Sequence, residues 1–339
     1  MSTKGAALFK SPGKGGKGRI RPRGRQLQSS DRSALADCLG DGDVTRDRLI
    51  EYLHVIQDRH GQIRKGLLHA LADRMNLPMA EVFEVAEFYH NFVVVDDDAP
   101  QAKPVVHVCD SLSCVMAGAD QLADELAERL GARAEVRRAA CLGRCDGAPA
   151  TRIGWNYETG GDVAAIESLI DQDGMGILPA VEGLDDYRQG GGYTLLRQLH
   201  QGDIQADDVL ATLNDAGLRG LGGAGFPTGR KWQFVRAEPG PRLMAVNGDE
   251  SEPGTFKDRH FLLTRPHRML EGALIAAHVI KAEKLYIYIR DEYPDVRQVL
   301  ADRVAELPEL GLTLPDIEIR RGAGAYICGE ESAMLESLE

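Results

Sequence analysis

The sequence contains few cysteines and no long apolar segment. Six cysteines in 339 residues are too few for the disulfide framework of a secreted scaffold, and their clustering favours metal or redox chemistry in a reducing compartment. No uninterrupted apolar run is long enough to span a bilayer, and the N-terminal segment lacks the apolar centre of a signal peptide. We therefore expect a cytoplasmic protein that does not act at a membrane.

Basic residues are fewer than acidic residues. The chain has 40 Lys and Arg residues against 52 Asp and Glu residues, a formal net charge of −12, which argues against nonspecific nucleic-acid binding. With a soft prior of ~150 residues per domain, the 339 residues predict about two domains. The composition, 43% hydrophobic and 27% charged, is ordinary for a globular protein.

The N-terminal segment differs from the rest of the chain in charge. Residues 1–30 hold eight Lys or Arg residues and no acidic residue, and they contain too few apolar groups to become ordered alone. We interpret this segment as a basic disordered arm, which is either a solvated tail or a part that orders against an acidic partner subunit. Its Gly and Pro residues argue against the amphipathic helix of a mitochondrial transit peptide.

Residues 31–170 are expected to form a helical bundle followed by a compact α/β unit. Within 45–92, apolar residues recur at helical spacing, and breaks at Gly61 and Asn76-Leu77-Pro78 predict short helices. From residue 103 the pattern alternates, and we expect strands at 105–108, 133–138 and 149–154 and helices at 118–130 and 162–170.

Residues 171–192 are expected to be a linker, because they contain many Gly and Asp residues and no clear periodicity. A second α/β domain is predicted over 193–339, with helices at 206–215, 264–281 and 294–306 and strands at 243–246, 285–289 and 316–321. The apolar residues Met334, Leu335 and Leu338 predict a helix still in progress at the last residue, without a stop signal. We therefore expect the sequence to stop within this domain.

Four cysteines lie in two pairs in the first α/β unit. Cys109 and Cys114 are separated by four residues, and Cys141 and Cys145 by three. Each pair follows a predicted strand, where loops can direct thiolates to a common point. Four thiolates suit zinc or an iron–sulfur cluster, but structural zinc prefers shorter C-x2-C spacings, and disulfides would need an oxidising compartment. The spacing therefore favours a [2Fe–2S] cluster.

The helical bundle, the C-x4-C pair and the segment CLGRCDGAPA together resemble the thioredoxin-like [2Fe–2S] subunit of respiratory complex I and its relatives. This resemblance implies that all four cysteines of the two pairs are cluster ligands. Cys38, which stands alone in a polar stretch, is interpreted as a structural or surface thiol. Cys328 belongs to a motif of the second domain and is not expected to bind metal.

The second domain begins with a glycine-rich loop, GLRGLGGAGFPTGRKW. Gly220-x-Gly222-x-x-Gly225 satisfies the dinucleotide-binding fingerprint formally, but that fingerprint requires a preceding strand. Here the preceding segment is predicted to be helical, which disfavours an ordinary Rossmann turn. Glycines still allow backbone N–H groups to approach a phosphate closely, and Lys231 adds a positive charge. A flexible spacer is the alternative, although a spacer would not need Phe226, Trp232 or Phe234.

An acidic turn follows the strand predicted at 243–246. The segment NGDESEPGTFKDR concentrates polar side chains at the strand end: Asn247, Asp249, Glu250 and Glu252. Such a turn is either solvated or a polar site, because carboxylates can accept hydrogen bonds from flavin or ribose.

The glycine loop, the acidic turn and GAGAYICGEES together resemble the FMN- and NADH-binding subunit of complex I, the diaphorase module shared with NAD-linked formate dehydrogenases and NAD-reducing hydrogenases. The resemblance implies the cofactors [2Fe–2S], FMN and NAD. It assigns one wall of the FMN site to Gly220, Gly222, Gly223, Gly225, Lys231, Asn247, Asp249 and Glu250, and the opposite wall to Tyr326, Gly329, Glu330 and Glu331. Phe226 and Phe234 would stack on the adenine of NADH, with core packing as their alternative role, and Glu252 would be the catalytic-site residue near the nicotinamide.

The fusion of both domains in one chain, with all four cluster cysteines, most resembles the beta subunit of molybdenum- or tungsten-containing NAD-dependent formate dehydrogenases. This implies a large metal-pterin partner subunit with iron–sulfur clusters. A diaphorase of an NAD-reducing hydrogenase or of complex I remains an alternative, as does an iron–sulfur scaffold or sensor with a vestigial flavin site. The family continues beyond this C-terminus with further flavin contacts and a [4Fe–4S] domain, so we expect this chain to retain FMN weakly.

Overall fold

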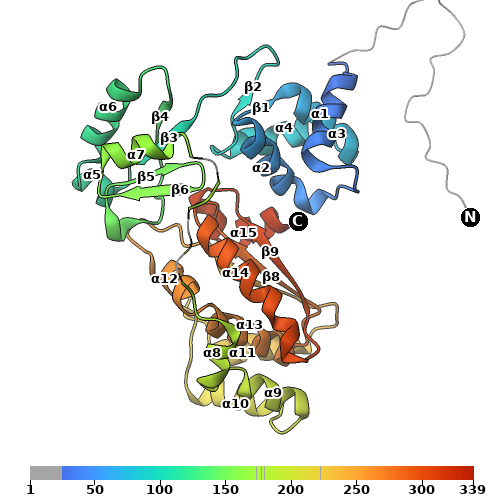
Figure 1. Ribbon diagram of the computed structural model, residues 1–339. Helices are drawn as coiled ribbons and strands as arrows, with labels where there is room; N and C mark the ends of the chain where they lie inside the picture. Colours follow the sequence, from blue (N-terminus) through green and yellow to red (C-terminus); the bar gives the residue numbers. More distant parts are fainter. Residues whose placement is uncertain (1–24, 173, 177, 179, 222) are drawn as a thin grey trace, which may run out of the picture.

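The computed structural model describes residues 25–339 except residues 173, 177, 179 and 222. The predicted basic arm therefore lies largely outside the described residues. Figure 1 shows a helical bundle in blue, a small α/β domain in green and a second α/β domain in yellow to red below them. The predicted arrangement, a helical bundle and a compact α/β domain followed by a further α/β domain, is confirmed.

The bundle forms because short amphipathic helices bury one apolar face each. Leu53 and Ile56 of the second helix, for example, are fully buried. That helix ends at Gly61 and the next at Asn76, both in the left-handed conformation (φ 68° and 56°) that glycine and asparagine tolerate best. The bundle contains the helices α1 (Ser29–Leu39), α2 (Leu49–His60), α3 (Lys65–Met75) and α4 (Met79–Phe88), and the short parallel pair β1 (Ile63–Arg64) and β2 (Val94–Val95).

The green domain is built on a mixed sheet with the strand order β4-β3-β5-β6. Strand β3 pairs in parallel with β4 and antiparallel with β5, so the ends of β3 and β4 lie at the same edge of the sheet. Its strands are β3 (Val105–Cys109), β4 (Glu135–Ala139), β5 (Ala150–Ile153) and β6 (Asn156–Thr159), and its helices are α5 (Leu112–Met116), α6 (Ala119–Leu130) and α7 (Val163–Leu169).

The lower domain contains a parallel sheet with the order β7-β8-β9. Because the strands are parallel, the segments that follow them meet at one edge, where open α/β sheets usually bind ligands. The strands are β7 (Leu243–Gly248), β8 (Lys284–Ile289) and β9 (Asp316–Arg321). The helices are α8 (Leu184–Gln189), α9 (Thr194–Gln201), α10 (Ala206–Asp215), α11 (Thr228–Ala237), α12 (Lys257–Thr264), α13 (Pro266–Ile280), α14 (Pro294–Glu306) and α15 (Glu331–Leu338).

The structure differs from the sequence-based prediction mainly in short helices. The segment predicted as a linker contains α8, whose Leu184 is buried in the core of the lower domain. Helix α1 begins at Ser29, inside the range predicted for the arm. Helix α11 directly follows the glycine loop, and α12 follows the acidic turn. Helices of this length contain too few turns for a clear apolar periodicity.

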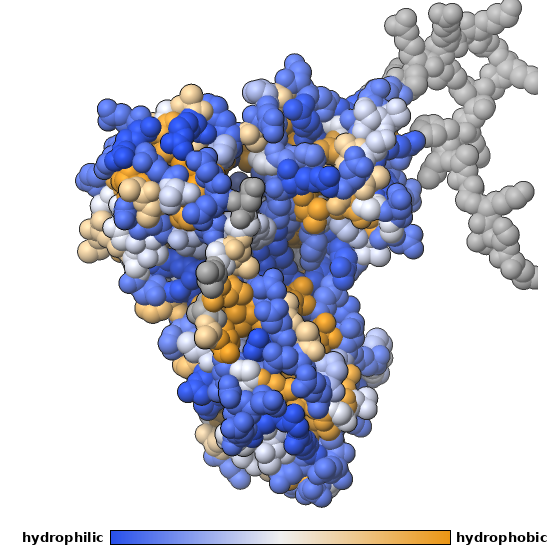
Figure 2. All heavy atoms as spheres, in the orientation of Figure 1, coloured by the Kyte–Doolittle hydropathy of each residue, from blue (hydrophilic) through white to orange (hydrophobic). Residues whose placement is uncertain are grey.

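The bundle packs on the lower domain through a shared apolar core. Tyr288 of β8, Cys328, and Met334 and Leu338 of α15 belong to the same buried cluster as the bundle residues, and the C-terminus lies beside the bundle in Figure 1. Hydrophilic residues cover most of the face shown in Figure 2, with narrower apolar strips over the lower domain. Among the described residues, no helix combines the length and apolar character that crossing a membrane requires.

The Asp291 side chain accepts hydrogen bonds from the bundle region, the green domain and the lower domain. It follows β8, is 3% exposed, and accepts charged hydrogen bonds from Arg152 of β5 (2.8 Å) and Arg321 of β9 (2.7 Å). The side-chain amide of Asn91, which follows α4, also donates to it (2.9 Å). Burial alone would raise the pKa of Asp291, but Arg321 and Arg152 hold this pKa well below its ordinary value. The carboxylate is therefore an ionised anchor for all three parts.

Candidate cluster and flavin site

The four paired cysteines lie at one edge of the green sheet. Cys109 is the last residue of β3, and Cys114 lies on α5, while Cys141 and Cys145 lie on the loop after β4. Because β3 and β4 are parallel neighbours, their following loops meet. Cys109, Cys114 and Cys141 are buried and Cys145 is half-buried. The structure thus brings the four predicted ligands together.

The thiols are near enough to interact. Cys141 Sγ lies 3.5 Å from Cys145 Sγ and accepts the Gly143 N–H at 3.4 Å. A hydrogen bond with Cys109 is the main cause that lowers the pKa of Cys141 to about 5, and the same bond raises the pKa of Cys109. The Cys109 thiol, together with the Gly143 N–H, therefore favours a thiolate at Cys141, which is the form that binds metal.

Four cysteine side chains are a donor set that a [2Fe–2S] cluster uses. Such a cluster takes four cysteine thiolates, and Cys141 and Cys145 lie side by side with their Sγ atoms 3.5 Å apart. Backbone N–H donors to sulfur, such as Gly143, are a further feature of iron–sulfur sites.

The acidic turn and the GAGAYICGEES segment lie side by side, as expected for two walls of one site. Asn247 Nδ2 donates to the Gly329 carbonyl at 2.8 Å, and Tyr326 Oη donates to Glu252 Oε2 at 2.5 Å. A Cβ atom on residue 329 would lie 3.0 Å from the Asp249 carbonyl oxygen. Glycine at 329 therefore allows the two segments to approach closely.

Asp249 has an unused acceptor in this site. Its Oδ1 accepts from the Ser251 hydroxyl, but its Oδ2 is shielded from solvent and has no hydrogen-bond partner. Burial raises the pKa of Asp249 to about 6. A shielded carboxylate oxygen without a donor fits a ligand that supplies N–H or O–H groups, and FMN carries both.

Replacing Asp249 with Asn is expected to stabilise the FMN-free chain at pH 8 by about 2–3 kcal/mol and to have little effect near pH 4. The raised pKa means that the native state resists ionisation, so the wild type loses stability as the pH rises from the unfolded value of 3.8 to about 6. Urea unfolding at both pH values measures the difference. An equal gain at both values would contradict a pKa raised by burial.

Glu250 has a different environment from its neighbours. It is 4% exposed, and its carboxylate accepts from the backbone N–H groups of Asp258 (2.9 Å) and Arg259 (3.1 Å) in the first turn of α12. The Tyr293 hydroxyl also donates to it at 3.1 Å. The carboxylate thus stabilises the start of α12, and its predicted contact with FMN remains a prediction.

The glycine loop has its own internal structure. The Gly220 N–H donates to the Phe226 carbonyl at 3.0 Å, and Gly223 and Gly225 have φ values of 111° and 60°, which favour glycine. Gly222 lies outside the described residues. No hydrogen bond between described residues joins this loop to the acidic turn, so its part in a common site remains a prediction.

The predicted adenine-stacking aromatics are accessible. Phe226 is 45% exposed and Phe234 is 55% exposed, and their ring centroids lie 6.3 Å apart with a tilt of 52°. This exposure disfavours the alternative of core packing. Lys231, which lies between these two residues in the sequence, is exposed on α11.

The remaining predicted residues lie at the start of α15. The Glu330 carboxylate accepts from the backbone N–H groups of Ser332 (3.0 Å) and Ala333 (3.1 Å), and the Ser332 hydrogen bonds lower the pKa of Glu330. Glu331 is exposed in the first turn.

The two remaining cysteines lie away from the four paired ones. Cys328 is buried in the core shared with the bundle, and Cys38 Sγ lies 3.3 Å from His60 Nε2 near the surface.

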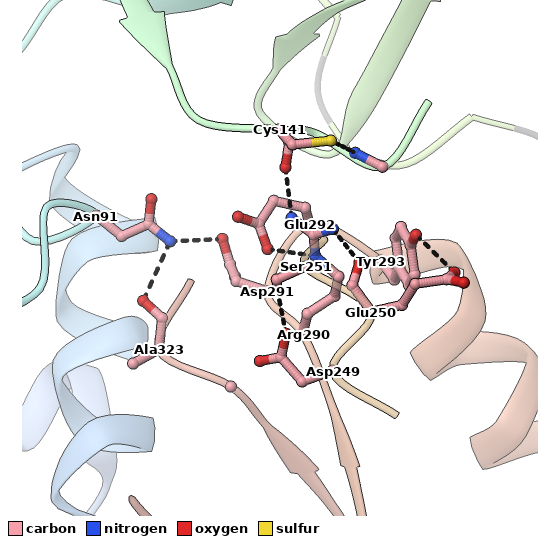
Figure 3. A network of polar contacts seen from close by, with 12 residues as sticks. Asn91, Cys141, Asp249, Glu250, Ser251, Arg290, Asp291, Glu292, Tyr293 and Ala323 are labelled. Carbon is pink, nitrogen blue, oxygen red and sulfur yellow. Dashed lines mark hydrogen bonds and ion pairs between the residues drawn. The ribbon is translucent and has the colours of Figure 1, made fainter. Parts of the chain in front are cut away.

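Sequence reasoning missed the residues that connect the two sites. Figure 3 shows Arg290, at the end of β8, between Cys141 of the cluster loop and Glu250 of the acidic turn. Arg259, the last residue of the acidic segment NGDESEPGTFKDR, also donates to Asp146, the neighbour of Cys145. The available signal was the run of charged residues RDE directly after a buried strand. The cluster loop and the acidic turn are therefore in direct contact.

The fold and the two adjoining sites define an iron–sulfur flavoprotein. Residues 37–173 match the family "Thioredoxin-like [2Fe-2S] ferredoxin", and residues 213–339 match the family "Nuo51 FMN-binding domain". The chain therefore joins a thioredoxin-like [2Fe–2S] domain to an FMN-binding domain of the complex I type, and [2Fe–2S] and FMN are its cofactors.

Relatives of the chain are subunits of larger complexes. It is 33% identical to the NAD-reducing hydrogenase HoxS subunit alpha of Cupriavidus necator, over 87% of this chain and 56% of that protein. It is 44% identical to a subunit of the NADH-quinone oxidoreductase of Aquifex aeolicus, over 48% of this chain and 39% of that protein. A crystal structure of NAD+-reducing [NiFe]-hydrogenase in the air-oxidized state superposes with a TM-score of 0.72 at 33% identity, covering 86% of this chain and 54% of that one. The chain thus spans about half, or less, of the length of these relatives.

Proposed function

We propose that the chain is the diaphorase part of an NAD-linked oxidoreductase complex, in which it carries electrons between NAD(H) and iron–sulfur centres. The observation that carries this proposal is the contact between the acidic segment and the cluster loop, through the Arg259–Asp146 ion pair and through Arg290. Contact between the two loops keeps the path between their cofactors short. The similarity to HoxS subunit alpha and to the NADH-quinone oxidoreductase of Aquifex aeolicus supports the same activity.

FMN exchanges electron pairs as hydride with NAD(H) and single electrons with iron–sulfur clusters. Glycine N–H groups of the 217–229 loop and Lys231 would hold the FMN phosphate, and Asn247 and Asp249 would hydrogen-bond the flavin. Tyr326 and Glu252 are exposed at the edge of this site, and a hydrogen bond joins their side chains. Phe226 and Phe234 would stack on the adenine of the nucleotide, which orients the nicotinamide toward Glu252.

The test is NADH-dependent reduction of ferricyanide by the purified chain, with and without added FMN. Activity that requires FMN and saturates with NADH is the expected result. A chain with a full iron content and bound FMN that never reduces ferricyanide would instead support an iron–sulfur scaffold or sensor.

Replacing Glu252 with Gln is expected to lower kcat/KM for NADH about 10–100-fold, because a hydrogen bond to a charged group contributes roughly 1.5–3 kcal/mol. Steady-state ferricyanide assays measure the change. Glu309→Gln, at an exposed position of the lower domain, is the matched control and should keep the wild-type value. Equal kcat/KM values for Glu252→Gln and the control would show that Glu252 does not act in the nicotinamide site.

We propose further that the electron donor is a large metal-pterin subunit of a formate dehydrogenase, containing molybdenum or tungsten and iron–sulfur clusters. The fused arrangement with four cluster cysteines in proximity supports this choice. The likeness of both domains to HoxS subunit alpha favours a second candidate, the diaphorase of an NAD-reducing hydrogenase. Metal analysis of the co-purified complex separates the two, since nickel would identify the hydrogenase.

A further inference from the structure

The Arg290 side chain is almost completely buried, and each of its three guanidinium nitrogens donates a hydrogen bond. It is 2% exposed, and its Nη2 donates to the Cys141 carbonyl and its Nη1 to the Glu250 carbonyl, each at 2.5 Å. Its Nε donates to Glu292 Oε2 at 3.0 Å. The Tyr293 ring lies 5.0 Å from the guanidinium. Figure 3 shows this guanidinium between the cluster loop above and the acidic turn below.

The two carbonyl groups belong to different domains. Cys141 is a predicted cluster ligand of the thioredoxin-like domain, and Glu250 lies in the acidic turn of the FMN-binding domain. A guanidinium is planar and rigid, so two donors on the same group set the separation of the two carbonyls. Lysine, with one flexible ammonium group, cannot reproduce this fork.

We propose that Arg290 is a positioning residue that holds the cluster loop against the flavin turn and, by its buried charge, raises the reduction potential of the cluster. The proposal rests on the proposed function, because it requires the [2Fe–2S] cluster at the four cysteines. Arg290 touches the Cys141 carbonyl rather than its sulfur and so acts through the loop.

The direction of the effect follows from electrostatics. Reduction adds one electron, and therefore one negative charge, to a cluster that already has four thiolate ligands. A cation beside the loop stabilises the reduced form more than the oxidised form, and net charge and hydrogen bonding set such potentials. The Glu292 carboxylate offsets part of the positive charge of Arg290. The position in which the two hydrogen bonds hold the guanidinium therefore determines how strongly the remaining charge acts on the cluster.

The experiment is an EPR-monitored redox titration of the full chain with its cluster loaded, using dithionite as the one-electron reductant with mediators. Arg290→Met should shift the midpoint to a lower potential, with the ratio of reduced to oxidised cluster at a fixed potential falling on the order of tenfold. Arg290→Lys keeps the charge without the fork, and its midpoint should lie between those of Arg290→Met and the wild type.

Arg320→Met is the matched control. Arg320 is 1% exposed and lies in the same sheet, but it is paired with Asp47, Glu51 and Glu318 and not with the cluster loop. It should lose thermal stability and keep the wild-type midpoint.

An unchanged midpoint in both Arg290 variants, with their cluster signal present, would overturn the proposal and leave the proposed function intact. If Arg290→Met does not fold, Arg290→Lys alone decides, because a wild-type midpoint there shows that the fork has no effect. A loaded wild-type chain with no signal from a reduced binuclear cluster would refute the proposed function itself.

Discussion

Replacing Asp291 with Ala is expected to destabilise the folded chain by about 3–5 kcal/mol, because it removes a buried carboxylate that two largely shielded guanidinium groups share. Arg152 and Arg321 come from different domains and share this carboxylate, and Asn91 of the bundle region loses its acceptor as well. Chemical unfolding of the variant and the wild type at neutral pH measures the loss. The depressed pKa keeps Asp291 ionised well below neutral pH.

The control for this prediction is an exposed ion pair. Asp171 pairs with Arg133 at 3.2 Å, but these side chains are 79% and 54% exposed, so Asp171→Ala should cost less than about 1 kcal/mol. Equal losses for the two variants would show that Asp291 contributes no more than a surface charge. A separate unfolding step in the Asp291 variant would indicate that the domains have lost their coupling.

The second large effect concerns the cluster. Cys141→Ala is expected to abolish the [2Fe–2S] cluster, because the remaining thiols cannot complete two pairs of ligands. Cys141 is also the thiol that hydrogen bonds most favour as a thiolate, with a pKa lowered to about 5. Iron content, visible absorbance and the EPR signal after dithionite reduction should all fall to background.

Cys38→Ala provides the comparison for that experiment. Cys38 lies in α1, near His60 and away from the paired cysteines, so this variant should keep its iron and its EPR signal. A full signal in Cys141→Ala would exclude Cys141 as a ligand. Loss of the signal in Cys38→Ala would mean that the fold of the bundle, and not the ligand set, controls loading.

The regular elements could be predicted from the sequence because they have strong apolar patterns. Helices α6, α10, α13 and α14 and strands β3, β7, β8 and β9 occur where periodicity predicts them, within a few residues. Helices α1, α5, α8, α9, α11 and α12 were missed. Their stability comes from tertiary packing, as shown by Leu184 and Leu196 in the core of the lower domain, and not from a long local pattern.

The sequence predicted that the paired cysteines lie close together, but it did not predict the contacts that join the two sites. The spacing of Cys109, Cys114, Cys141 and Cys145 is a local signal, and the structure brings these four thiols together. By contrast, the contact of Arg290 with Cys141 joins residues 149 positions apart. No local rule predicts which buried arginine meets which loop. For the same reason the role of Glu250 at the start of α12 became evident only from the fold.

The burial of the cysteines has a consequence for how the holoprotein matures. Cys109, Cys114 and Cys141 are at most 3% exposed, and the ring of Tyr293 lies so near Gly143 that a Cβ atom there would come within 2.4 Å of it. Loading of the cluster therefore requires these three thiols to become accessible, either before the thioredoxin-like domain docks on the lower domain or during an opening of the loop.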